Sequence, residues 1–590
     1  MTLEIMAILV ILSGMMYCLV REIGRPELVM FFTVALCILS GILTPAEALK
    51  GFSNEGMMTI ALLFIVGGII QQSGILTSFV DVVLGKARSP RIAMLRMMIP
   101  VSLLSAFMNN TPIVVMFMAY IREWCEKHHI SPSKFLIPLS YASIFGGMVT
   151  LIGTSTNLII HGLMLDRGMP GLSMFQLAIV GIPGASLATI YMVTLGYRLL
   201  PNHAIAPTHP THAKEYLTEA CVDNNAPIIG QTIQEVGLRN LKGLYLIEII
   251  RQGETISPVT PKDKLCAGDR LIFTGVVSTI VELNQIKGLD IETNSQLNLE
   301  DLKRGNARLI EAVISHQSSL LSQTVKQTNF RSKYDAAVVA VHRHGERLEN
   351  KIGDIQLKTG DTLLLLVGTQ FANRFASQRN DFYLTTPVAD MTFKASWKPK
   401  FAISLLVVMI VLAAFNILSM FQAALLVVSL LIVTQTVTAN EAKNYMQFNV
   451  LLLIASSFGI GAALEKTGTA SWIAQTLTEL PFIHHLIGYL LVMYILTNLL
   501  TEFMSNSATA VMMFPIAIET ANQLSVDPMG FIVVITIAAS AGFATPIGYQ
   551  TNLLVYGLGR YRFADYMKVG IPLNVIYMIL SILIINYWYY

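Results

Sequence analysis

The fold is decided by the segment Thr501-Glu502-Phe503-Met504-Ser505-Asn506-Ser507-Ala508-Thr509-Ala510, which interrupts an apolar stretch from about 486 to 519 with consecutive polar residues. Non-helical backbone at membrane depth must be buried in protein or line a cavity. The pattern therefore predicts a re-entrant hairpin. The same pattern occurs 396 residues earlier, where Asn109-Asn110-Thr111-Pro112 interrupts the apolar stretch from about 97 to 120.

The composition around these two segments indicates a membrane protein. Of 590 residues, 54% are hydrophobic and 13% are charged, about half the charged fraction of a soluble globule. A net charge of +3 produces no field that would indicate nucleic acid as a partner. The five cysteines lack metal or disulfide spacing, and we find no nucleotide loop or nucleophile–base pair, so we do not expect an enzyme.

Ten further apolar segments are long enough to span a bilayer of about 30 Å. They lie near 2–20, 27–43, 57–75, 135–165, 174–197, 401–418, 422–438, 448–464, 528–558 and 570–588. Between 199 and 393 charged residues are frequent and apolar runs shrink to strand length. The predicted fold is an all-α polytopic membrane protein with about ten spans, two re-entrant hairpins and an inserted α+β domain.

Positive charge predicts the orientation, because cytoplasmic loops retain Lys and Arg. With both hairpins re-entrant, the loops on the side of the insert carry Arg21, Arg25, Lys86, Arg88, Arg91, Arg96, Arg122, Lys127, Lys134, Arg198, Lys394, Lys398, Lys400, Lys443, Arg560, Arg562 and Lys568. The opposite loops carry only Lys50, Arg167 and Lys466. We therefore expect a multi-pass protein of the plasma or inner membrane, with a cytoplasmic insert and both termini outside.

The two flanks of the chain match each other. Besides the hairpin segments, Ile152-Gly153-Thr154-Ser155-Thr156-Asn157-Leu158 aligns with Ile547-Gly548-Tyr549-Gln550-Thr551-Asn552-Leu553 at an offset of 395. The charge count places the hairpins on opposite sides, so we predict inverted repeats over 1–198 and 394–590. Inverted repeats with paired broken helices are typical of secondary transporters that bind substrate near the membrane midplane.

The insert contains its own repeat. Ile228-Ile229-Gly230-Gln231-Thr232-Ile233 aligns with Leu320-Leu321-Ser322-Gln323-Thr324-Val325 at an offset of 92, and Gly268-Asp269 recurs as Gly360-Asp361. We predict two small α+β modules, over 199–290 and 291–393.

Helix ends broken inside a membrane expose N–H groups that attract anions. No Lys or Arg occurs between 97 and 121 or between 467 and 559, so an anion there would be neutralised by dipoles, amides, hydroxyls and co-bound cations. Oxygen ligands from Ser, Thr and Asn suit a hard cation such as sodium. The alternative is that these side chains only satisfy freed backbone groups. Glu502 could carry a proton or accept hydrogen bonds from backbone N–H groups.

The hairpin segments resemble those of the divalent anion/sodium symporters, which carry sulfate or di- and tricarboxylates. The resemblance covers the membrane part and implies an elevator-type mechanism, a homodimer and a small anionic substrate. It implies one sodium site at Ser105, Asn109, Asn110 and Gly153, and another at Thr501, Met504 (backbone carbonyl), Asn506 and Gly548. It implies that Asn110, Thr111, Asn506 and Ser507 face the anion, with Thr154 and Tyr549 at its flanks.

The chain departs from this family at Asn109, where the family has Ser, and at Ser507, where it has Thr. Where carboxylate carriers tend to have Gly-Thr-Pro-Pro-Asn, the chain has Gly153-Thr154-Ser155-Thr156-Asn157. The added hydrogen-bonding groups favour a sulfate-like oxyanion, with a sodium-coupled di/tricarboxylate symporter as the alternative.

The insert is similar to two copies of the TrkA-C regulatory module of potassium-transport regulators. These modules could bind a small regulatory ligand or serve as a dimer platform. They also raise the alternative of a regulated ion channel, although the chain has no T-V-G-Y-G filter.

Overall fold

The structure is a computed structural model. In the flanks it describes residues 3–21, 23–72, 89–128, 130–203 and 398–590 without 416, 447 and 480–484. In the middle it describes 217–238, 244–252, 254–256, 259, 262–275, 288–291, 308–315, 318–343, 346–348, 352–367, 371, 374 and 381–384. The predicted loop charges Lys86, Arg88 and Lys394, the end of the predicted span 57–75 and the predicted boundary at 393 lie outside these residues.

The first flank is helical. Its α-helices are α1 (Leu3–Val20), α2 (Pro26–Leu39), α3 (Pro45–Leu49), α4 (Glu55–Gln72), α6 (Pro90–Ser105), α7 (Asn110–Lys127), α8 (Leu136–Gly147), α9 (Ser155–Asp166), α10 (Ala178–Tyr191) and α11 (Tyr197–Leu199). A π-helical segment, Met192–Gly196, joins the last two. A 3-10 turn, η1 (Lys50–Ser53), follows α3.

The last flank is helical too, with α15 (Lys398–Ala414), α16 (Met420–Val433), α17 (Ala439–Tyr445), α18 (Phe448–Lys466), α19 (Thr469–Thr478), α20 (Leu486–Phe503), α21 (Asn506–Gln523), α22 (Pro528–Ser540), α23 (Gln550–Leu558) and α24 (Phe563–Tyr589). Among the described residues, five helices are long and apolar enough to cross a membrane: Pro45–Ile69, Ala178–Leu199, Phe448–Lys466, Leu486–Phe503 and Phe563–Tyr589. Shorter apolar helices accompany them, so the count of ten spans stays a prediction.

Both predicted interruptions separate pairs of helices. Residues 106–109 lie between α6 and α7, and residues 504 and 505 lie between α20 and α21. The segments predicted near 135–165 and 528–558 are each divided as well, by breaks at 148–154 and 541–549. The short helices α3 and α17 were not predicted; each begins with a capping box, Thr44 with Glu47 and Thr438 with Glu441.

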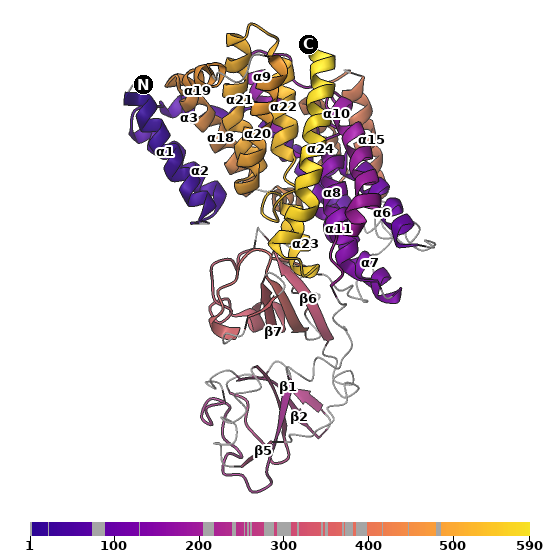
Figure 1. Cartoon of the computed structure of the whole chain (residues 1–590). Coiled ribbons are helices and arrows are strands. Elements are labelled where there is room, and N and C mark those ends of the chain that lie inside the picture. The colour runs from indigo at the N-terminus through magenta and orange to yellow at the C-terminus, as the bar shows by residue number, and fades with distance from the viewer. Residues whose placement is uncertain are drawn as a thin grey trace.

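The middle of the chain forms two antiparallel sheets. The first has the order β3-β2-β4-β1-β5, from β1 (Leu217–Val222), β2 (Leu244–Arg251), β3 (Glu254–Ile256), β4 (Arg270–Gly275) and β5 (Leu289–Ile291). The second has the order β10-β6-β9-β7-β8, from β6 (Arg308–Ile314), β7 (Ala336–Arg343), β8 (Glu346–Arg347), β9 (Thr362–Val367) and β10 (Phe382–Leu384), with the short helix α13 (Phe330–Tyr334). The two orders are equivalent strand by strand. Both sheets lie below the helices in Figure 1, and the second is nearer to them.

The two helical flanks pack into one core around their broken helices. Tyr141 on α8 donates a hydrogen bond to the Phe543 carbonyl in the second break, and the Phe145 ring stacks on Phe543 with centroids 4.6 Å apart. Tyr191 on α10 donates to the Val569 carbonyl on α24. These contacts hold each flank against the other near the breaks.

Candidate functional site

The tip of the first hairpin brings three oxygen atoms together. Ser105, at the end of α6, has its Oγ 2.6 Å from Oδ1 of Asn110, the first residue of α7, and 2.8 Å from the Ser143 carbonyl oxygen on α8. A hydroxyl carries one hydrogen, so it can donate to only one of these two acceptors at a time. The tip therefore presents more acceptor oxygens than donors.

The tip of the second hairpin repeats this arrangement. Thr501 on α20 has its Oγ1 3.0 Å from Oδ1 of Asn506, the first residue of α21, and 2.6 Å from the Ala539 carbonyl oxygen on α22. All three residues stand 396 positions after their counterparts in the first tip. Two matching oxygen clusters thus lie at the two hairpin tips.

Each break is held by an asparagine that follows it. Asn157 donates from Nδ2 to the carbonyls of Gly147 (3.1 Å) and Thr150 (2.8 Å). Asn552 donates in the same way to Gly542 (2.8 Å) and Thr545 (3.1 Å). These two asparagines therefore act structurally, as in the alternative that polar side chains only satisfy freed backbone groups. They satisfy carbonyls that the interrupted helices leave without partners.

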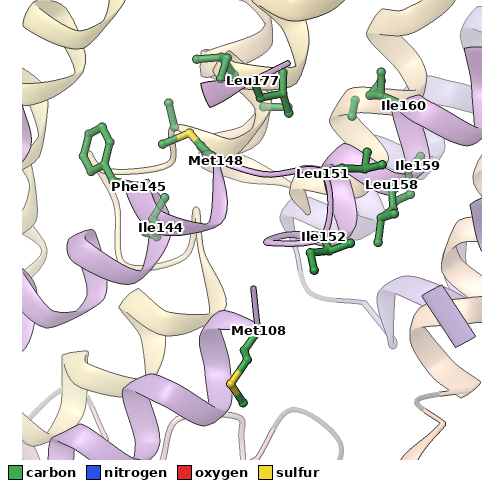
Figure 2. Packing of buried hydrophobic residues seen from close by; sticks show 14 of the residues in the cluster. Met108, Ile144, Phe145, Met148, Leu151, Ile152, Leu158, Ile159, Ile160 and Leu177 are labelled. Atoms are coloured by element: carbon green, nitrogen blue, oxygen red, sulfur yellow. The ribbon is translucent and has the colours of Figure 1, made fainter. Parts of the chain in front are cut away.

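The first break lies inside the apolar core. Met148, Leu151 and Ile152 are buried there, together with Met108 from the hairpin tip and Leu158 from α9 (Figure 2). Burial of the break in protein meets the condition for non-helical backbone at membrane depth.

The two flanks differ at Glu502. Its carboxylate accepts hydrogen bonds from the backbone N–H groups of Ala544 (2.8 Å) and Thr545 (2.9 Å) and from Nδ2 of Asn574 (3.2 Å). The equivalent position in the first hairpin is Ala106. Of the two roles considered for Glu502, these contacts fit that of an acceptor, and its N–H donors belong to the break.

Side chains at four helix N-termini meet between the flanks. Tyr549, directly before α23, accepts a hydrogen bond from Nδ2 of Asn110 at the start of α7, and its hydroxyl is 3.1 Å from Oγ1 of Thr154, directly before α9. Ser155, the first residue of α9, has its Oγ 3.5 Å from that of Ser507 in the first turn of α21. The helices α7, α9, α21 and α23 therefore begin at one place.

The electrostatics at this place follow from the helix ends. The first N–H groups of a helix have no intrahelical partner and carry part of a charge of about +0.5. Neither Thr154 nor Tyr549 caps its helix with a side-chain hydrogen bond. N–H groups at α9 and α23 are thus left to bind a ligand, and an anion is the ligand they favour.

The structure unites part of the predicted site. Asn110 contacts Ser105 and Tyr549, and Tyr549 in turn contacts Thr154. Asn506 contacts Thr501. A Cβ on Gly153 would lie 2.5 Å from the Gly147 backbone carbonyl oxygen, so that position requires glycine, whereas one on Gly548 would lie 2.7 Å from a side-chain atom, Oε2 of Glu502.

Three predicted residues lie less centrally. Asn109 is exposed, Thr111 is buried in the first turn of α7, and the Met504 side chain packs with α1, α2 and α18. The Met504 prediction concerns its carbonyl oxygen, so this packing leaves that prediction as it stands.

Sequence reasoning did not single out Ser140 and Asn574. Oγ of Ser140 on α8 lies 2.7 Å from Oδ1 of Asn552 and 2.8 Å from Oγ1 of Thr551, more than 400 residues away. The sequence signal for both residues is a lone polar residue within an apolar span.

The chain is similar to a known protein family and to several individual proteins. The family model CitMHS, described as citrate transporter, matches residues 8–538. A transporter of Synechocystis sp., described as uncharacterized, is 35% identical over 92% of this chain and 90% of its own length. A protein of Chlamydomonas reinhardtii named for the regulation of the sulfur deprivation response is 32% identical, covering 96% of this chain and 98% of that one.

A more distant relative carries a more specific name. Sodium/sulfate cotransporter 1 of Chlamydomonas reinhardtii is 25% identical, covering 94% of this chain and 87% of its own length. Similarity to transporters along nearly the whole chain points away from enzymatic activity, as the sequence analysis expected.

Proposed function

We propose that this chain, which belongs to the CitMHS family described as citrate transporters, is a secondary active transporter that takes up a small divalent anion together with sodium. The anion binds where α7, α9, α21 and α23 begin. Sodium binds at the two hairpin tips, and the membrane lipid is the surrounding solvent.

One observation carries this proposal: side chains at four helix N-termini touch one another between the two flanks. A dianion such as sulfate presents four oxygens to four sets of N–H groups, so its charge is spread over several helix ends. Asn110, Thr111, Asn506 and Ser507 supply amides and hydroxyls, with Thr154 and Tyr549 beside them. No Lys or Arg from 97–121 or 467–559 is available to neutralise the charge.

The oxygen clusters support sodium as the coupling ion. In each tip a hydroxyl oxygen lies 2.6–3.0 Å from an amide oxygen and from a backbone carbonyl oxygen, and one hydroxyl hydrogen cannot satisfy both acceptors. A hard cation can bind all three oxygens, and its charge would offset that of the anion. Ser105, Asn109, Asn110 and Gly153 bind one ion, and Thr501, Met504, Asn506 and Gly548 bind the other.

Two observations bear on the anion. Hydrogen-bonding residues at Ser155, Gln550 and Tyr549 favour a compact oxyanion, and a relative is named a sodium/sulfate cotransporter. The family description names citrate instead, so a di- or tricarboxylate is the second candidate.

The repeated hairpins also support a mechanism of alternating access. The flanks act as inverted repeats in an elevator-type exchange, within a homodimer whose modules are cytoplasmic and whose termini are outside. The insert comprises two TrkA-C-like modules, over 199–290 and 291–393.

The test is uptake of radiolabelled sulfate by the purified protein in liposomes, with an inward sodium gradient or an equal potassium gradient. We expect sulfate to accumulate only with the sodium gradient, and we expect this accumulation to persist when a protonophore is present. Accumulation without sodium would exclude sodium coupling. Stronger competition by citrate or succinate than by unlabelled sulfate would make a carboxylate the substrate.

A variant pair links this transport to the site. Asn506→Ala removes one amide from the second tip and should lower uptake at least about tenfold, since hydrogen bonds to charged groups are worth about 1.5–3 kcal/mol. Asn522→Ala changes an exposed asparagine on the same helix and should leave uptake unchanged. Normal uptake by the first variant would exclude this tip from the site.

A further inference from the structure

The second sheet contacts the membrane part at two helices of the candidate site. Glu311 on β6 forms an ion pair with Arg122 on α7. The turn before β9 lies against α23: a Cβ on Gly557 would be 3.1 Å from Oγ1 of Thr362 and 3.3 Å from the Gly360 carbonyl oxygen. Figure 1 shows this sheet directly below α23, with the first sheet farther away.

The same module also reaches the N-terminal helices. Nη2 of Arg25, directly before α2, lies 3.5 Å from the carbonyl oxygen of Ser318. Helix α2 packs on α18 through Val34, whose side chain is 3.1 Å from a Cβ placed on Gly459. The module thus connects α7 and α23 with α2, which belongs to a different part of the helical bundle.

Comparison of the two modules shows that the docked copy has changed at this surface. In the first module Glu219 on β1 pairs with Arg270 on β4. The equivalent of Glu219, 92 residues later, is Glu311, but the equivalent of Arg270 is Thr362. The short side chain leaves room for α23, and Glu311 pairs with a residue of the membrane part instead.

Charges around Glu311 favour this docking. Burial would raise the pKa of Glu311, but Arg122, with His342 and Arg560, outweighs burial and the pKa is lowered. Glu311 is therefore ionised at neutral pH and available to the cation on α7.

Both docked helices begin at the candidate site. Helix α7 starts at Asn110 and meets the module at Arg122, and α23 starts at Gln550 and meets it at Leu553 and Gly557. A movement of α7 and α23 relative to α2 has to break one of the module's contacts.

Resting on the transport function proposed above, we propose that the second module is a brake: docked on α7 and α23 and touching the turn before α2, it holds the membrane part in one conformation, and transport requires its release. A regulator that binds the modules would act by changing how readily this contact opens.

A cross-link tests whether release is required. The pair Thr362→Cys and Gly557→Cys, in a chain whose five native cysteines are replaced, places a sulfur about where Thr362 Oγ1 stands, next to the new Cβ. We expect oxidation to lower sulfate uptake at least about tenfold and a reductant to restore it. If the oxidised, cross-linked protein takes up sulfate as fast as the protein treated with reductant, the brake is overturned.

A reciprocal pair of variants tests the direction of the effect. Thr362→Arg gives the second module the arrangement of the first and places a long side chain against α23, so the initial uptake rate should rise about threefold or more. Arg270→Thr, the reverse change in the first module, should leave the rate unchanged. An unchanged or lower rate for Thr362→Arg would contradict a brake.

Hydrogen exchange provides a readout that needs no transported anion. Backbone amides of α23 should exchange faster in Thr362→Arg than in the unmodified chain or in Arg270→Thr. Equal exchange in all three would mean that the module does not hold α23, whatever the protein transports.

Discussion

Thr501 and Ser105 hold equivalent places, each with a hydroxyl between an amide oxygen and a backbone carbonyl of a neighbouring helix. A hydroxyl in this position either donates a hydrogen bond within the protein or gives its oxygen to a cation. The two roles differ in what they predict for sodium.

Thr501→Val removes the hydroxyl and keeps the shape of the side chain. We expect the sodium concentration for half-maximal uptake to rise roughly threefold to tenfold, which corresponds to about 0.7–1.4 kcal/mol. Thr497→Val is the control, because Thr497 is buried one turn earlier on α20 and its hydroxyl donates only to the Met493 carbonyl within that helix. An equal sodium response in both variants would mean that Thr501 is structural.

Tyr549 hydrogen-bonds with Asn110 and Thr154 through its hydroxyl, and Tyr549→Phe removes only that group. We expect the sulfate KM to rise about fivefold or more, with the sodium response unchanged, since the hydroxyl belongs to the anion side of the site. The control is Tyr489→Phe, which removes a hydroxyl that donates to the Thr478 carbonyl. It should leave the sulfate KM unchanged. A changed sodium response in Tyr549→Phe would assign the tyrosine to the sodium site rather than to the anion site.

At the scale of elements, the breaks depend on side chains that replace missing helical hydrogen bonds. Asn157 and Asn552 do this symmetrically, whereas Glu502 does it only in the second flank. A carboxylate that accepts two backbone N–H groups and an amide holds the second break in shape.

Glu502→Gln retains one acceptor oxygen and turns the other into a donor that faces backbone N–H groups. We expect it to destabilise the folded protein by about 1–3 kcal/mol, the cost of an unsatisfied buried group, measured as a lower melting temperature in detergent. Sodium-dependent uptake per folded molecule should persist. Unchanged stability together with a loss of uptake would instead make Glu502 a proton carrier.

The first module contains a pH-sensitive group. Glu248 on β2 is buried, its Oε2 has no hydrogen-bond partner among the described residues, and burial raises its pKa to about 7. A carboxyl whose pKa is higher in the folded state binds its proton more tightly there, so stability falls as the pH rises from about 4.5 to about 7. The module should therefore be more stable at pH 5 than at pH 8.

Limited proteolysis of the full chain on heating, with cleavage followed in the first module, measures this effect. The unmodified protein should lose resistance between pH 5 and pH 8, and Glu248→Gln should lose much less. An equal loss in both proteins would assign the pH effect to other groups.

The elements could be predicted where a local rule applies. Polar residues inside apolar stretches predicted the four places where the helices are interrupted, because lipid tolerates no unpaired backbone. The partners of those residues could not be predicted: Ser140 meets Asn552, and Glu502 meets Ala544 and Thr545, across separations that no local pattern encodes. The short helices α3 and α17 were missed because their capping boxes lie between apolar segments.

At the scale of the whole molecule, the sequence alignment of the flanks predicted which segments correspond, and matching hydrogen bonds occur at the corresponding positions. The docking of the second module on α7 and α23 was not predicted. Repetition within the insert makes the modules look equivalent, and the pairing of Glu311 with Arg122 and the contact of Thr362 with α23 distinguish the second from the first among the described residues.

At the end of the membrane part away from the sheets, ion pairs join helical elements to one another. Lys50, in η1, pairs with Asp166 at the end of α9, and Arg167 pairs with Glu465 on α18. Such exposed pairs contribute about 0–1 kcal/mol each. Each is therefore a weak attachment, whereas the second module contacts α7 and α23 at the other end of the membrane part.

In the proposed site, four helix ends bind an anion with the help of sodium and without a basic side chain. The most direct measurement is equilibrium binding of radiolabelled sulfate to the purified protein, in sodium and in choline, for the unmodified chain and for the double variant Asn110→Ala/Asn506→Ala. We expect saturable binding that requires sodium and is lost in the double variant. Binding of equal affinity in choline, or binding that survives loss of both asparagines, would contradict the claim.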